Sequence, residues 1–335
     1  MMNQEFQLPP KKTNPSGNER SIGFEFEFTG VEMEDVASMI SDLYGGRINQ
    51  LSTYEFTITG TIFGDFGLEL DAQLIREKKY EKLLKSIGID LSTYDSQESF
   101  EDSLKGLASS VVPYEIITPP IPLSRIEELT KLVDELRKMK AKGTGSSFVY
   151  AFGLHINPEI PDRSTASILN HLRAFILLEP WIRKKAVIDV SRRLTPFINR
   201  FDNEYILRIL NSAYKPDQTE FIKDYFAFGN SRNRPLDLQP LFMYLDTDLT
   251  KKLIDDTLTS PRPTYHYRLP NCSLEDETWT LAAEWNRWVL VEKLADDEKE
   301  LNKYSKAYLK MWQETMVRFE VKWIEHMERW VQHVW

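Results

Sequence analysis

The chain has 335 residues, of which 41% are hydrophobic and 12% aromatic, enough apolar material for one large packed domain or two ordinary ones. Its net charge is −9, and its Lys and Arg residues are dispersed. This disfavours nucleic acid as a partner, because phosphate contacts dominate that kind of binding. A single cysteine, Cys272, excludes an internal disulfide framework and a zinc cluster of several thiolates, and it fits a reducing compartment.

The N-terminal sequence and the hydropathy pattern indicate where the protein resides. No apolar run approaches the roughly 18–20 residues that a membrane span requires, and residues 1–20 lack the apolar core of a signal peptide. We therefore expect a cytoplasmic protein with no membrane partner. Residues 1–20 combine Pro, Lys, Asn, Ser and Gly with little apolar content, which predicts a flexible tail.

The first ordered element is predicted at 21–29, where the sequence reads SIGFEFEFT. A strand with this alternation places Phe24, Phe26 and Phe28 on one face and Glu25 and Glu27 on the other. The two acids would then be roughly 6–7 Å apart. One alternating strand is more often half solvated than catalytic, because antiparallel sheets commonly face water on one side. The polar faces of the other predicted strands therefore decide whether this one is part of a site.

The next predicted elements run from 31 to 142. A helix over 31–46 ends at two glycines, and 54–74 is typical of a hairpin. Residues 76–110 are polar and charge-rich, and they predict an elaboration around one or two helices. A short strand over 112–120 ends at two prolines. Residues 121–142 predict an amphipathic helix, with Ser124 and Glu127 spaced as a capping box.

The C-terminal half is predicted to be mostly helical. Strands are expected at 147–158 and 263–271, with helices over most of 164–248 and over 274–297. In the last run, about 297–334, apolar residues recur every three or four positions, a length that exceeds an ordinary helix. It either bends round the core or packs on another subunit of a homo-oligomer. The tryptophans of this run favour core packing.

The predicted strands share one property, since each pairs an apolar face with a face of acids, histidines or arginine. A solitary histidine in a strand is a structural, hydrogen-bonded residue about as often as it is a functional one. An aspartate at the end of a hairpin can simply form a turn. The joint pattern is more specific than any single strand. In chain order, the chemistry-bearing residues opposite the apolar faces are Glu25, Glu27, Glu69, Asp71, Glu115, His155, Asn157, His266 and Arg268.

Several carboxylates on one sheet face raise one another's pKa unless a cation neutralises them. Mg²⁺ and Mn²⁺ prefer carboxylate oxygens and water, and Mg²⁺ is commonly held by a few carboxylates together with substrate phosphates. No glycine-rich phosphate loop of the GxxxxGK[ST] or GxGxxG kind is present, so a nucleotide would be held by side chains and metals. Arginine forks suit phosphate oxygens. The candidates are Arg192, Arg193, Arg200, Arg234 and Arg268.

Six motifs, in this order, are GFEFEF, FGDFGLELD, PYEIITPP, AFGLHIN, NRPLDLQPLF and YHYRLPN. Together they resemble the amidoligase family, a branch of the carboxylate–amine ligase superfamily that includes glutamine synthetase and gamma-glutamylcysteine ligase. The likeness covers about 21–296. It implies an α+β fold in which an antiparallel sheet curves into an active-site funnel with helices on its outer face. Residues 21–296 would be the catalytic domain, and 297–335 a long C-terminal amphipathic helix.

The resemblance also implies an activity, the ATP-dependent joining of a small-molecule or peptide carboxylate to an amine through an acyl phosphate. Arg268, Arg234 and His266 would be catalytic, and the nucleotide would contact His155, Asn157, Arg200 and Arg234. The family pattern leaves the third acid open, since Asp65 or Asp71 could replace Glu69, and it assigns no residue to deprotonate the amine. The implied ligands of Mg²⁺ or Mn²⁺ are Glu25, Glu27, Glu69, Glu115 and His155.

One departure from the family concerns the last strand. The family commonly has Glu-aromatic-Arg there, whereas this chain has His266-Tyr267-Arg268. Histidine ligates Mn²⁺ or Zn²⁺ better than Mg²⁺, so the departure bears on metal preference and on activity. Two alternative functions stay open at this point. One is a phosphotransferase resembling guanidino kinases, and the other is a nucleotide-binding interaction protein that has lost turnover.

Overall fold

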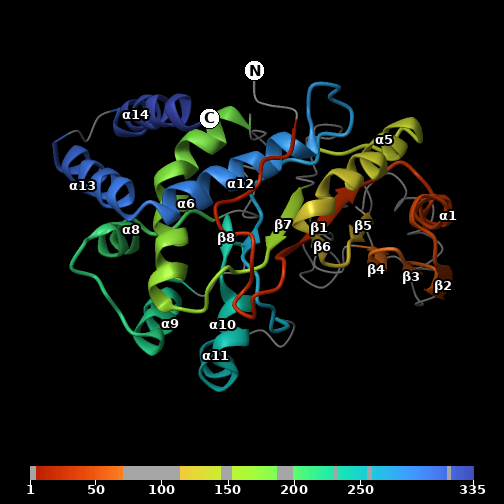
Figure 1. Ribbon diagram of the computed structural model, residues 1–335, viewed down its shortest axis with the longest axis horizontal. Coiled ribbons are helices and arrows are strands. Elements are labelled where there is room, and N and C mark those ends of the chain that lie inside the picture. The colour runs from red at the N-terminus through yellow and green to blue at the C-terminus, as the bar shows by residue number, and fades with distance from the viewer. Residues whose placement is uncertain are drawn as a thin grey trace, which may run out of the picture.

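The computed structural model describes residues 5–70, 114–144, 153–186, 199–229, 233–254, 259–314 and 318–335. These residues form a mixed α+β structure around one antiparallel sheet (Figure 1). The strand order is β2-β3-β4-β5-β1-β7-β9-β8, and β6 pairs with β1 off this path. The strands are β1 (Ser21–Phe28), β2 (Arg47–Ser52), β3 (Glu55–Thr61), β4 (Gly64–Leu70), β5 (Tyr114–Ile117), β6 (Ile121–Pro122), β7 (Leu154–Pro158), β8 (Leu236–Asp237) and β9 (His266–Tyr267).

The helices lie in two groups. The first group, α1 and α5, lies near β2 to β5 (Figure 1). In the second group α8, α12, α13 and α14 pack on α6, whereas α10 and α11 pack on each other below β8 (Figure 1). A 3₁₀ helix over Leu123–Leu129 precedes α5. The α-helices are α1 (Met33–Tyr44), α5 (Thr130–Lys138), α6 (Thr165–Lys185), α8 (Asn203–Leu210), α9 (Gln218–Ala227), α10 (Gln239–Leu245), α11 (Thr247–Leu253), α12 (Leu281–Asp296), α13 (Glu298–Glu314) and α14 (Phe319–Val334).

The alternation along β1 places its phenylalanines in the core. Phe24, Phe26 and Phe28 are fully buried. On β9, the ring of Tyr267 lies 5.8 Å from that of Phe175 in α6 and 5.5 Å from that of Trp288 in α12. Helices α6 and α12 therefore cover the apolar face of this part of the sheet. The predicted opening strand and the hairpin of β3 and β4 are confirmed, and β2 is an additional strand.

The segment predicted as a single capped helix over 121–142 differs in the structure. Ile121 and Pro122 pair with β1, and the 3₁₀ helix follows directly. The predicted capping box is therefore wrong, because no side chain caps this helix and the backbone N–H of Ser124 donates to Glu19 Oε1 at 2.7 Å. Because Ile121 and Pro122 are extended and paired with β1, they cannot form the first turn of a regular α-helix.

The C-terminal run forms two helices in place of the long helix that was expected. Arg318 directly precedes α14 with φ of 64°, a left-handed conformation that interrupts an α-helix. Helix α14 packs back on α6, where Trp323 is fully buried and its Nε1 donates to the carbonyl of Leu177 at 2.8 Å. The run thus bends round the core. A homo-oligomer stays a prediction.

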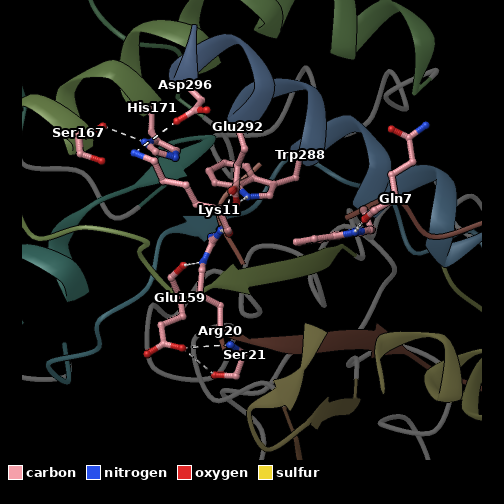
Figure 2. Close-up of polar contacts among 11 residues, drawn as sticks. Gln7, Lys11, Arg20, Ser21, Glu159, Ser167, His171, Trp288, Glu292 and Asp296 are labelled. Atoms are coloured by element: carbon pink, nitrogen blue, oxygen red, sulfur yellow. Dashed lines mark hydrogen bonds and ion pairs between the residues drawn. The ribbon is translucent and has the colours of Figure 1, made fainter. Parts of the chain in front are cut away.

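Residues 5–11, part of the segment predicted to be a flexible tail, lie along α12, and the chain then leaves this helix before it enters β1 (Figures 1 and 2). Trp285 Nε1 donates to the carbonyl of Gln7 at 2.8 Å. The guanidinium of Arg20 donates to both carboxylate oxygens of Glu292 at 2.7 Å, and both side chains are buried. Trp288 Nε1 donates to the same carboxylate at 2.6 Å. The N-terminal segment is thus bound to α12 at two places, near Gln7 and at Arg20, the residue that precedes β1.

Some predictions fall outside the described residues. They are the elaboration at 76–110, the position of Asp71, the first residues of the 147–158 strand, and Arg192 and Arg193. The division into a tail, a catalytic domain over 21–296 and a C-terminal segment stays a prediction. Within the described parts of the chain, no helix has both the length and the apolar character needed to cross a membrane.

Candidate functional site

The strand register brings acids together on the polar face of the sheet. Glu69 of β4 pairs with Glu115 of β5, and Glu115 in turn pairs with Glu27 of β1. Two residues before Glu27, Glu25 pairs with His155 of β7. Three carboxylates therefore lie side by side on adjacent strands, an arrangement that like-charge repulsion disfavours unless a cation lies among them.

The carboxylate of Glu25 is the centre of the most buried part of this face. Glu25 is only 8% exposed. Its Oε2 lies 2.7 Å from His155 Nδ1 and 3.5 Å from His266 Nε2. Its Oε1 accepts hydrogen bonds from Asn157 Nδ2 at 2.9 Å and from Arg262 Nη1 at 3.2 Å. Residues far apart in the sequence thus converge on one carboxylate.

Each of the two histidines lies between acids. His155 Nε2 lies 3.4 Å from Glu27 Oε1, and the other oxygen of Glu27 accepts from the backbone N–H of Gly153 at 2.5 Å. His266 Nδ1 lies 3.8 Å from Asp237 Oδ2 on β8. The two imidazole rings are 5.1 Å apart, edge to face. Carboxylates and imidazoles therefore alternate across four strands in the series Glu27, His155, Glu25, His266 and Asp237.

Burial and neighbouring charges set the protonation states at the centre of this series. Burial alone would raise the pKa of the Glu25 carboxyl, but the charge of His266 and a hydrogen bond from His155 hold that pKa well below its usual value. Burial and the charge of Arg268 lower the pKa of His155 from 6.5 to about 3, against the opposing effect of Glu25. At neutral pH the pair is a carboxylate and a neutral imidazole, the forms that bind metal ions.

Two groups of three residues have donor atoms that all lie within 4.8 Å of one another. The deep group is Glu25, His155 and His266, and the outer group is Glu27, Glu115 and His155. Carboxylate oxygens and imidazole nitrogens are the usual protein ligands of divalent metals, so both groups fit such an ion. The structure thus brings together four of the five predicted ligands. Glu69 pairs with Glu115 but belongs to neither group.

The predicted arginines are placed differently from one another. Arg268 lies just after β9, is buried, and is close enough for its charge to act on His155. Arg234 donates to the carbonyls of Arg200 and Phe228, both at 2.7 Å, so its guanidinium holds two loops together. Arg200 binds Glu320 of α14 at 3.0 and 3.2 Å. Only the first of these side chains lies near the metal-ligand groups.

Arg200 lines a cavity of about 700 Å³ formed by residues of α6, α8, α13 and α14, on the helical side. The alternative acid Asp65 lies near the start of β4, where its Oδ1 accepts from the backbone N–H of Gly60 in β3 at 2.8 Å. This contact links the two strands close to their connecting turn. The placement of Arg200 and Asp65 therefore gives no support to a role beside the two donor groups.

Sequence reasoning missed Asp237 and Arg262. Asp237 lies between Leu236 and Leu238, both fully buried, so the alternation in the motif PLDLQP could have assigned it to the polar face. Arg262 lies between two prolines, outside any strand or helix, and no periodic pattern points to it. Its contact with Glu25 depends on how the loop before β9 is folded.

The chain was compared with known protein families, curated proteins and solved structures. A family model described as "Putative amidoligase enzyme" matches residues 18–290. These residues include every member of both donor groups. Comparison with curated proteins and with solved structures gave no match.

Proposed function

The chain belongs to the amidoligase family, a family of ligase-type enzymes, and on that premise we propose that it joins a carboxylate to an amine with ATP and a divalent metal. The observation that supports this most directly is the convergence of both donor groups on the polar face of the sheet, inside the matched residues. Such a concentration of acids suits a reaction that moves the highly charged phosphates of ATP, provided that metal ions are bound there.

The proposed reaction begins with transfer of the γ-phosphoryl group of ATP to an oxygen of the substrate carboxylate, which gives ADP and an acyl phosphate. A divalent ion held by the carboxylates of Glu27 and Glu115, beside His155, would supply positive charge against the phosphate oxygens. The guanidinium of Arg268, buried beside the same face, would bind the negative charge that develops during the transfer.

The second half of the reaction is attack of the amine nitrogen on the acyl carbon. The C–N bond forms, the bond to phosphate breaks, and the amine loses one proton, so the products are an amide, phosphate and a proton. Glu25, Asn157 and Arg262 keep the deep end of the site rigid through the hydrogen bonds on Glu25 Oε1.

The proposal is tested by product analysis with ATP, Mg²⁺ or Mn²⁺ and panels of carboxylic acids and amines. ADP and phosphate should appear only when an acid and an amine are both present, together with the corresponding amide by mass spectrometry. Glu27→Gln and Glu115→Gln should abolish this turnover. Glu55→Gln is the matched control, since Glu55 pairs with Glu69 in the same sheet but is exposed and belongs to neither donor group.

The same experiment separates the alternative functions. Undiminished turnover in the Glu27→Gln, Glu115→Gln double variant would refute the proposed site. A stable phosphorylated product without an amide would identify a phosphotransferase. Tight binding of ATP without any product across the panels would identify a nucleotide-binding protein that has lost turnover.

A further inference from the structure

We propose that the deep group, Glu25, His155 and His266, selects a first-row transition-metal ion of the zinc or cobalt type over Mg²⁺. The inference rests on the proposed function in one respect, namely that the polar face of the sheet binds metal. It goes beyond that function because it assigns different ions to the two ends of the same face, from the donor atoms of this chain.

The donor set of the deep group is two imidazole nitrogens and one carboxylate oxygen. Imidazole nitrogen suits zinc and its neighbours in the first transition row, whereas Mg²⁺ prefers oxygen ligands and retains water. Three protein ligands with further coordination positions open is also the usual arrangement of a catalytic zinc site. The outer group has two carboxylates and one imidazole, with Glu69 paired next to Glu115, and this composition is closer to what Mg²⁺ prefers.

The two histidines are held from behind, as metal-binding histidines usually are. One nitrogen of each ring faces Oε2 of Glu25, at 2.7 Å for His155 Nδ1 and 3.5 Å for His266 Nε2. The other nitrogen of each ring faces a second carboxylate, Glu27 at 3.4 Å and Asp237 at 3.8 Å. Carboxylates in this outer position orient a histidine ligand and increase its basicity.

Glu25 is oriented in the same way. Hydrogen bonds from Asn157 and Arg262 both end on Oε1, so Oε2 is the oxygen that faces the imidazoles. An ion bound there would replace the present contact between Glu25 and His155. His266 is 9% exposed, and its Nε2 makes no hydrogen bond among the described residues. Its nearest acceptor is Glu25 Oε2 at 3.5 Å, too long for a good hydrogen bond, and a metal ion bound between the two atoms would supply a stronger interaction.

Asp237 acts in this arrangement as a positioning residue. It is 1% exposed, and its Oδ1 accepts from the backbone N–H of Gln239 at 2.9 Å, which leaves Oδ2 directed toward His266. Because β8 and β9 pair at Asp237 and His266, the sheet itself fixes this contact. Asp237 thus orients the imidazole of His266. A glutamate at position 266 would have no ring nitrogen for Asp237 to orient.

The test is a titration of metal-free protein with Zn²⁺, Co²⁺ and Mg²⁺ by calorimetry, with the visible absorption of Co²⁺ as a report on its ligands. Zn²⁺ and Co²⁺ should bind about 100-fold more tightly than Mg²⁺. His266→Glu should narrow this gap and change the Co²⁺ spectrum, because one nitrogen ligand becomes oxygen. Asp237→Asn should weaken Co²⁺ binding by about 10–100-fold. His171→Gln is the matched control, since His171 is also buried but lies outside the cluster.

Equal affinity of the wild type for Zn²⁺ and Mg²⁺, or a Co²⁺ spectrum that His266→Glu leaves unchanged, would overturn the inference. If His266→Glu does not fold, the wild-type titration and the isosteric Asp237→Asn variant still decide. Amide formation with Mg²⁺ by a protein that shows no preference for Zn²⁺ would leave the proposed function standing while this inference fails. If the protein binds Co²⁺ selectively but makes no amide, this inference stands and the proposed function fails.

Discussion

Two groups of charged side chains, one beside α12 and one on the polar face of the sheet, differ in how their charges are paired. Beside α12, Arg20 and Glu292 balance each other, and the guanidinium also donates to the carbonyls of Glu159 and Lys11 at 2.7 Å (Figure 2). On the polar face of the sheet, Glu27 and Glu115 lie side by side, and His266 Nε2 has no hydrogen bond among the described residues. A closed network of the first kind stabilises one conformation, whereas an arrangement of the second kind is typical of a functional site.

The largest expected effect is on turnover. Glu25→Gln should lower amide formation by about 10³-fold or more, because loss of a metal ligand removes several kcal/mol of charge stabilisation. The free energy of unfolding of metal-free protein should fall by only about 1–3 kcal/mol, because the amide keeps the size of glutamate but cannot accept all the hydrogen bonds from His155, Asn157 and Arg262. Turnover assays and urea unfolding measure the two quantities. A large loss of stability with normal turnover would mean that the polar face is structural.

The Arg20 pair should show the opposite behaviour. Arg20→Met leaves Glu292 buried without its partner and should cost about 3–5 kcal/mol of unfolding free energy. The double variant Arg20→Met, Glu292→Leu should recover part of this loss, because both charges are then absent. Urea unfolding at neutral pH measures both. If the single variant is as stable as the wild type, the network of Arg20 and Glu292 does not contribute to the free energy of unfolding.

A smaller effect should appear in the pH dependence of stability. His171 stacks on Tyr265, and burial lowers its pKa from 6.5, so the folded state resists protonation. The unfolded chain therefore binds more protons below pH 6.5, and stability should decrease as the pH falls, by at most about 1.4 kcal/mol per pH unit for one group. His171→Phe should reduce this slope, as measured by urea unfolding between pH 7 and 5. Parallel curves for the two proteins would contradict the assignment.

The smallest effect should come from an exposed ion pair, which joins Lys11 of the N-terminal segment to Asp296 of α12. Lys11 Nζ lies 3.3 Å from Asp296 Oδ1, with side chains 50% and 42% exposed. Lys11→Met should change the unfolding free energy by only about 0–1 kcal/mol, because solvent screens such pairs. A cost comparable to that of Arg20→Met would show that burial is not what separates the two contacts.

The site was more predictable from sequence than the fold around it. Alternation placed Glu25 and Glu27 opposite the phenylalanines, and the same rule put His155, Asn157 and His266 on the polar face, because side chains in a strand alternate whatever its neighbours are. The placement of Arg200 and Arg234 depends on which carbonyls and acids the tertiary fold brings within reach. The 3₁₀ start of the 121–142 segment similarly depends on pairing of Ile121 and Pro122 with β1, which no local pattern records.

The position of Arg20 in the chain has a consequence for β1. Arg20 immediately precedes the strand, and the backbone N–H of Ser21 donates to Glu159 Oε2 at 3.0 Å, so the first residue of β1 is held in place. A slip of one residue in a strand exchanges its two faces. In β1 such a slip would turn the phenylalanines toward the site and the acids into the core. The salt bridge to α12 lies five residues before Glu25, so together with the buried phenylalanines it holds the register from which the site is assembled.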